Sequence, residues 1–85
     1  MKHLTVLSRT DCHLCDGMLA ALEAFREIAV ENFVIDVVDV DLHTALEEKW
    51  GDLVPVLLDG DVEICHYFLD LDRLSGHLAS LAREA

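Results

Sequence analysis

Apolar residues recur along the 85-residue chain with two spacings, and each spacing predicts one kind of element. Short apolar runs rich in β-branched side chains are typical of strands, whereas apolar positions three and four apart form one face of a helix. The runs predict strands at Lys2–Leu7, Phe33–Val40, Pro55–Leu58 and Asp61–His66. The helical spacing predicts helices from Cys12 to about Ala29, from about Leu42 to Trp50, and from Asp70 or Asp72 to about Arg83.

Polar residues and glycines mark where these elements begin and end. Asp41 is expected to cap the second helix, Gly51 to end it, and Asp70 or Asp72 to cap the third. Asp59-Gly60 is a strong hairpin signal. The strands on either side of it are therefore expected to run antiparallel.

The order strand, helix, strand, helix, strand, strand, helix (βαβαββα) defines an α/β fold. The first β-α-β unit gives two parallel strands through a right-handed crossover, and the hairpin adds two antiparallel ones. We therefore expect residues 1–85 to form a single domain, a three-layer sandwich with a mixed four-stranded sheet and three helices. Asp36 and Asp39 interrupt the second apolar run, which favours an edge position for that strand.

Charge and composition narrow the function. Six basic against seventeen acidic residues give a formal net charge of −11, which excludes nucleic-acid binding through phosphate neutralisation. No apolar stretch approaches the roughly 20 residues of a membrane span, and the N-terminus shows no signal peptide. Hydrophobic residues make up 53% of the chain, and three cysteines are too few for a secreted disulfide scaffold. We therefore expect a monomer of the reducing cytoplasm, without nucleic-acid or membrane partners.

Two cysteines three positions apart, Cys12 and Cys15, stand where the first strand meets the first helix. Cys-x-x-Cys at such a junction is typical of a dithiol redox centre. A thiol at a helix N-terminus faces unsatisfied N–H groups and the positive end of the helix dipole, and both favour the thiolate. Arg9 adds a fixed positive charge and His13 a conditional one, while Asp11 opposes them. The alternative is that both cysteines are buried structural residues.

The cysteine motif is part of a longer pattern. Ser8-Arg9-x-x-Cys12-His13-Leu14-Cys15 at the first junction, Val54-Pro55-Val56-Leu57 at the third strand, and the following Asp59-Gly60 resemble the small glutaredoxin-like proteins. The likeness runs from Leu4 to Leu81 and includes the order of the elements. It implies the thioredoxin fold in its minimal glutaredoxin form.

The resemblance also implies roles for individual residues. Cys12 would be the exposed nucleophile, and Cys15 the buried thiol that resolves the mixed disulfide. Val54-Pro55 would form a cis peptide beside the cysteines, with the valine backbone pairing with a substrate chain. Leu14 is expected in the same substrate-binding surface, and Arg9 matches the basic residue that glutaredoxins carry shortly before the motif.

One segment departs from the family. Glutathione-using glutaredoxins have a Gly-Gly pair and an acidic residue opening the last helix, whereas this chain reads Cys65-His66-Tyr67-Phe68-Leu69-Asp70. The missing glycines argue against a standard glutathione site, so no bound cofactor is expected and glutathione stays open as the reductant. Cys65 is expected on the side of the substrate, as a third redox thiol or a glutathionylation site. The commoner role of such a residue is that of a small buried apolar side chain.

Metal binding is the main competing chemistry. Cys12, Cys15 and Cys65 with His13 or His66 would supply four zinc ligands, although the spacing matches neither a zinc ribbon nor a zinc finger. An iron–sulfur cluster shared across a dimer, as some glutaredoxins bind, would normally need glutathione as a co-ligand. No metal site is therefore expected.

These observations favour a thiol–disulfide oxidoreductase that acts in cell redox homeostasis. Cys12 would attack the disulfide of a protein or of a glutathione-type substrate, and Cys15 would displace the reduced product. The alternative from another class is a redox-inert binding or adaptor module that keeps the fold, and the missing Gly-Gly pair sustains this alternative.

Overall fold

The computed structural model describes residues 2–84, in which four strands form one mixed sheet in the order β2–β1–β3–β4. β1 (Lys2–Ser8) pairs in parallel with β2 (Phe33–Asp39) and antiparallel with β3 (Val56–Asp59), which pairs antiparallel with β4 (Val62–His66). The parallel pair requires a crossover, which α1 (His13–Ile28) supplies. The predicted α/β order βαβαββα is confirmed, as is the edge position of β2.

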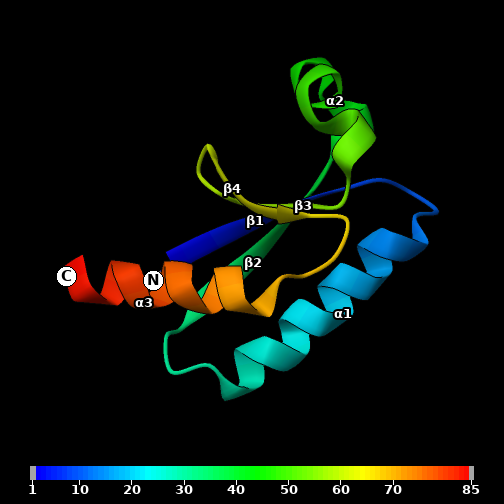
Figure 1. The fold of residues 1–85 in the computed structure, drawn as a ribbon. Coiled ribbons are helices and arrows are strands. Elements are labelled where there is room, and N and C mark those ends of the chain that lie inside the picture. The colour runs from blue at the N-terminus through cyan, green and yellow to red at the C-terminus, as the bar shows by residue number, and fades with distance from the viewer. Residues whose placement is uncertain (1, 85) are drawn as a thin grey trace.

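Helices cover both faces of the sheet. α1 and α3 (Leu71–Glu84) lie on one face, and α2 (Thr44–Trp50) lies on the other (Figure 1). The larger core fills the space between the sheet and the two long helices. Its buried side chains are Leu4, Val6, Met18, Leu22, Phe33, Leu57, Ile64, Cys65, Leu74 and Leu78. A smaller core under α2 is built from Leu7, Val40, Val56 and Leu58.

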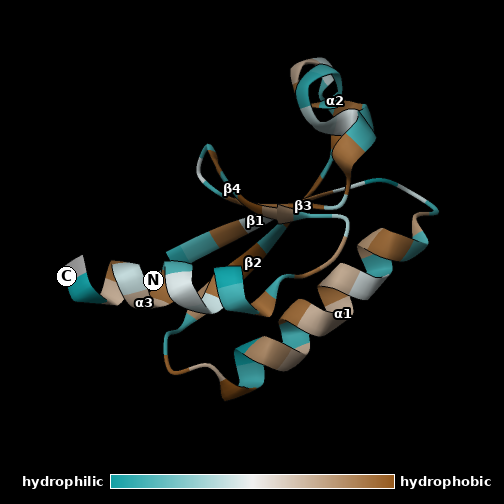
Figure 2. Cartoon of the chain, in the orientation of Figure 1, coloured by the Kyte–Doolittle hydropathy of each residue, from teal (hydrophilic) through white to brown (hydrophobic). Residues whose placement is uncertain are grey.

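The mixed pattern of helical positions is visible in α1 and α3, where brown apolar positions alternate with teal polar ones (Figure 2). Met18 and Leu22 are buried against the sheet, and Phe25 is half-buried and stacks with Phe33. Leu14 belongs to the same stripe but is 42% exposed, because it stands in the first turn of α1, at the edge of the sandwich. Burying each large apolar side chain contributes about 1.5–3 kcal/mol, so these helices are held mainly by packing.

The start of α2 differs from the prediction. Asp41 does not cap this helix, because Val40–Leu42 forms a short 3₁₀ turn, η1, in which the side chain of Asp39 accepts a hydrogen bond from the N–H of Asp41. The α-helix begins only at Thr44, after His43, whose side chain makes no capping bond. α2 ends at Trp50, and Gly51 continues with right-handed angles into a second 3₁₀ turn, η2 (Gly51–Leu53).

The N-terminus of α3 is capped by Asp70, one of the two predicted alternatives. Its carboxylate accepts a hydrogen bond from the N–H of Arg73 over 3.0 Å, and its carbonyl accepts the N–H of Leu74 over 3.0 Å. None of the helices within residues 2–84 is long and apolar enough to cross a membrane.

Three strand ends meet at one end of the sheet. Leu7 near the end of β1 lies opposite Val56 at the start of β3, and Val56 lies opposite His66 at the end of β4. The chain segments that leave these three positions therefore begin side by side. They carry the cysteine pair, the proline and the segment His66-Tyr67-Phe68-Leu69.

Candidate active site

Cys12 is the N-cap residue of α1. Its backbone is extended (φ −114°, ψ 106°), and its Sγ atom accepts a hydrogen bond from the backbone N–H of Cys15 over 3.1 Å. Asp11, directly before it, has a φ of 57°, a left-handed conformation that Asp adopts more readily than most residues. This sharp turn redirects the chain from β1 into α1, so that the sulfur faces the unsatisfied N–H groups of the first helical turn.

Cys12 and Cys15 are joined by a disulfide bond, with their Cα atoms 5.2 Å apart. Three residues advance the chain by almost one helical turn, which brings Cys15 to the same side of α1 as the N-cap. Cys15 is only 1% exposed, whereas Cys12 is half-buried. The difference in exposure is the one expected of an attacking sulfur and a resolving sulfur.

The peptide bond between Val54 and Pro55 is cis and leads directly into β3. Pro55 is buried, and Val54 is half-buried against the smaller core. Since β3 starts where β1 ends, this segment lies at the same end of the sheet as the loop that carries Cys12. Pairing of the Val54 backbone with a substrate chain stays a prediction.

Tyr67 connects the end of β4 to the proline segment. Its backbone N–H donates a hydrogen bond to the carbonyl oxygen of Pro55 over 2.8 Å, and its hydroxyl donates one to the carbonyl oxygen of Asp52 over 2.9 Å. Its φ is 65°, in the left-handed region that glycine normally occupies. The ring meets that of His66 edge-on, with centroids 4.8 Å apart. Tyr67 thus takes the conformation of a glycine in the segment that departs from the Gly-Gly pattern expected of glutathione-using glutaredoxins.

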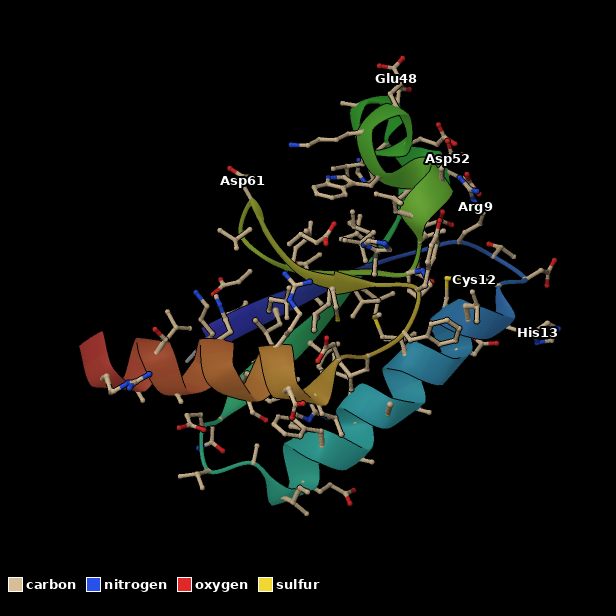
Figure 3. The ribbon with its side chains drawn as sticks, viewed as in Figure 1. Arg9, Cys12, His13, Glu48, Asp52 and Asp61 are labelled. Atoms are coloured by element: carbon tan, nitrogen blue, oxygen red, sulfur yellow. A yellow bond between two sulfur atoms is a disulfide. The ribbon has the colours of Figure 1, made fainter. Side chains whose placement is uncertain are left out.

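Arg9, expected to support a Cys12 thiolate, points toward α2 in Figure 3. Its guanidinium donates to Asp41 over 3.2 Å, to Glu47 over 3.0 Å and to the carbonyl oxygen of Gly51 over 3.4 Å. Two carboxylates therefore share its charge. Its clear structural effect is to tie the loop before Cys12 to η1, α2 and η2, and its effect on the thiolate stays a prediction.

His13 and Leu14, the two residues between the cysteines, are both exposed. His13 points outward from the start of α1 and away from the Cys12 side chain (Figure 3). Both residues line a groove between α1 and residues 67–69. The structure thus brings Leu14 to a surface beside the cysteine pair.

Cys65 lies in the larger core and is 4% exposed. It packs in the same cluster as Met18, Leu22 and Leu74. Burial raises the pKa of the Cys65 thiol, which disfavours the reactive thiolate. Its surroundings are those of a small apolar side chain, and a part in substrate binding stays a prediction.

The donor sets considered for a metal do not assemble. Among residues 2–84, no three or more His, Cys, Asp and Glu side chains lie close enough together to hold an ion. Cys12 and Cys15 are bonded to each other, and Cys65 lies in the core. The chemistry that this arrangement supports is thiol–disulfide exchange at Cys12.

The sequence patterns did not single out two residues of this region, Tyr67 and Phe68, which read as an apolar link between β4 and α3. The signal that would have found them is their position, because they lie in the segment that departs from the Gly-Gly pattern of glutathione-using glutaredoxins. Phe68 is 69% exposed and Tyr67 is 37% exposed. Neighbouring aromatic side chains that are both exposed are typical of a binding surface.

The mixed sheet between helices, with a Cys12–Cys15 pair at the start of α1, defines a protein of the thioredoxin fold. Residues 3–79 match the sequence profile of the glutaredoxin-like domain family (DUF836), and the chain belongs to this family.

Two solved structures are similar to this chain. The solution NMR structure of protein Ne2328 from Nitrosomonas europaea is 36% identical, with a TM-score of 0.78 over 89% of each chain. The X-ray structure of a protein from X. campestris is 37% identical, with a TM-score of 0.63 over 91% of this chain and 96% of that one. A search of curated proteins gave no match.

Proposed function

We propose that this protein is a thiol–disulfide oxidoreductase in which Cys12 is the nucleophile and Cys15 the resolving thiol. The observation that carries the proposal is the position of the pair. Cys12 is the accessible N-cap of α1, and Cys15 lies one turn on, buried and within bonding reach. A sulfur that accepts a backbone N–H at a helix N-terminus is stabilised as the thiolate, which is the attacking form.

The reaction runs from the reduced protein. The Cys12 thiolate attacks one sulfur of a substrate disulfide, forms a mixed disulfide, and releases the other substrate sulfur as a thiolate that takes up a proton. Cys15 then loses its proton to solvent and attacks the Cys12 sulfur, which releases the second substrate thiol. Two electrons pass from the protein dithiol to the substrate, and the Cys12–Cys15 disulfide remains. Two equivalents of an external thiol return it to the dithiol and leave as a disulfide.

The partners we propose are disulfide-bearing proteins or glutathione-type disulfides, and the compartment is the reducing cytoplasm. The high negative charge argues against nucleic acid. We propose that no bound cofactor is needed, because the exchange uses only the two sulfurs and a proton from solvent.

Redox titration tests this function. The protein is equilibrated in graded thiol–disulfide buffers, its free thiols are trapped by alkylation, and the products are weighed by mass spectrometry. The expected result is a reversible interconversion of Cys12 and Cys15 between dithiol and disulfide, abolished by Cys12→Ser and kept in Cys65→Ser. The proposal fails if the pair does not exchange with any buffer, which would favour a redox-inert binding module instead.

A further inference from the structure

An apolar groove of about 290 Å³ begins at the cysteine motif. One wall is formed by the first turns of α1, from His13 to Ala21, and the other by residues 67–69. Figure 1 shows this second wall as the connection that passes from β4 past α1 into α3. His13 and Leu14 are the two residues between the cysteines, so the groove borders the segment that carries the reacting sulfurs, while neither sulfur lines it.

The walls of the groove carry exposed apolar side chains, whose burial by a ligand would be favourable. Leu14 is 42% exposed and Phe68 is 69% exposed, while Met18 forms the buried floor. Tyr67 fixes the second wall, since its backbone and its hydroxyl are bonded to the Pro55 and Asp52 carbonyl oxygens. A bulky residue held at a φ of 65° is a local cost that persists only where the surrounding contacts impose it. The wall is therefore held in place before any ligand arrives.

Most charged residues in the chain segments that form or flank the groove are acidic. Asp11 precedes Cys12, Asp16 lies in the first turn of α1, and Asp70 follows the second wall directly. Segments 11–21 and 66–73 contain one Lys or Arg, Arg73. The guanidinium of Arg9 forms salt bridges with two carboxylates and is not free to pair with a ligand. With the net charge of −11, this surface repels anions and attracts cationic segments.

We propose that the groove receives a bulky apolar side chain that flanks the cysteine of an extended, cationic segment of a partner protein. The inference rests on the proposed function and names its substrate class. Glutathione carries a net negative charge and no apolar side chain. It would therefore neither fill the apolar groove nor be attracted by the acidic residues. The preferred substrate is therefore a protein disulfide, reduced by the exchange already written for Cys12 and Cys15.

The test compares matched disulfides that share one leaving thiol, 2-mercaptoethanol. The other half is a short Lys-rich peptide with a Cys-Leu pair, the same peptide with Cys-Ser, the Cys-Leu peptide with Glu in place of Lys, or glutathione. Oxidation of the reduced protein is followed by alkylation and mass spectrometry. The Cys-Leu peptide is expected to react about tenfold faster than the Cys-Ser peptide, because a Leu side chain is buried. The Glu peptide and glutathione are expected to be slower still.

Two variants link this preference to the groove. Phe68→Ser and Leu14→Ser are expected to bring the ratio between the Cys-Leu and Cys-Ser peptides close to one. Both side chains are exposed, so the core is unaffected. Ile28→Ser is the matched control, since Ile28 is 81% exposed at the far end of α1, and its ratio is expected to equal that of the wild type.

The outcomes separate the inference from the function beneath it. Equal rates for the two Lys-rich peptides, a fastest rate with glutathione, or a ratio unchanged in Phe68→Ser would overturn the inference while the oxidoreductase stands. No reaction with any of these disulfides would overturn both.

Discussion

The backbone N–H of Cys15 donates a hydrogen bond to the sulfur of Cys12 over 3.1 Å, so the first cysteine caps the helix turn that holds the second. N-cap positions are usually filled by an oxygen-bearing side chain, and here a sulfur takes that place. Because the N–H belongs to the helix backbone, we expect it to stay in position when the disulfide is reduced. A charged acceptor forms a stronger bond than a neutral one, so this contact favours the Cys12 thiolate.

This contact predicts unequal reactivity of the two thiols. In a Cys65→Ala background, Cys12 in the Cys15→Ser variant is expected to alkylate at least about tenfold faster at neutral pH than Cys15 in the Cys12→Ser variant. Cys12 has both the N-cap bond and the greater exposure. Iodoacetamide kinetics followed by mass spectrometry measure both rates. Equal rates would mean that the N-cap position confers no reactivity.

Arg9 gives a prediction about stability. Replacing it with Gln is expected to lower the free energy of unfolding by about 1 kcal/mol, because one half-buried side chain joins two carboxylates and a carbonyl oxygen. Arg26→Gln is the matched control, since Arg26 has a single exposed partner, Glu23, one turn away. This substitution is expected to lower the free energy of unfolding by only about 0.2–0.5 kcal/mol. Urea unfolding of both oxidised variants measures this, and equal losses would contradict it.

Asp59 predicts a pH dependence of stability. Burial by itself raises the pKa of Asp59, but hydrogen bonds and charges from Lys2 and His77 outweigh it and hold the pKa below its ordinary value. A carboxyl with a lowered folded-state pKa stabilises the fold above its unfolded-state pKa, and the contribution is lost as the pH falls through the folded-state pKa. The stability difference between wild type and Asp59→Asn is therefore expected to be full at about pH 6 and to shrink below about pH 4. Urea unfolding across this range checks it, and a difference independent of pH would refute it.

The fold was predictable because its signals are local and agree with one another. The β-branched run of β2, the Asp59-Gly60 turn and the apolar spacing of α1 each point to one element type. Their order admits few topologies once the crossover rule is applied. The two aspartates of β2 also placed it at the edge of the sheet.

The parts that could not be predicted depend on contacts between residues distant in sequence. Asp is a common helix-capping residue, yet the side chain of Asp41 pairs with Arg9 from the loop after β1. The carboxylate of Asp39 instead accepts the local hydrogen bond, from the N–H of Asp41. Tyr67 adopts a conformation that its own propensity disfavours, because carbonyl groups of the proline segment hold it there. Neither feature can be predicted from a short stretch of sequence.

Cys65 predicts a protected thiol. In the native oxidised protein it is the cysteine outside the disulfide, and it is 4% exposed among core side chains. Burial also raises the pKa of its thiol. A chromogenic thiol reagent is therefore expected to detect almost no fast-reacting thiol until urea unfolds the chain, when one thiol appears. Rapid labelling of Cys65 in the folded state would contradict its burial and revive the third-thiol role.

Tyr67 gives the sharpest test of the segment beside the cysteines, since its backbone is left-handed with a φ of 65°. Side chains at such a position cost roughly 1–2 kcal/mol relative to glycine. Tyr67→Gly is therefore expected to be more stable than Tyr67→Ala by about 1 kcal/mol, although both lose the ring and the hydroxyl bond to Asp52. Gly76→Ala is the matched control of opposite sign. Gly76 lies within α3 with open space at its Cβ position. Ala at this position is expected to raise the free energy of unfolding by about 0.5–1 kcal/mol. Urea unfolding measures all three variants, and an Ala at position 67 as stable as Gly would show that this segment is not held left-handed in solution.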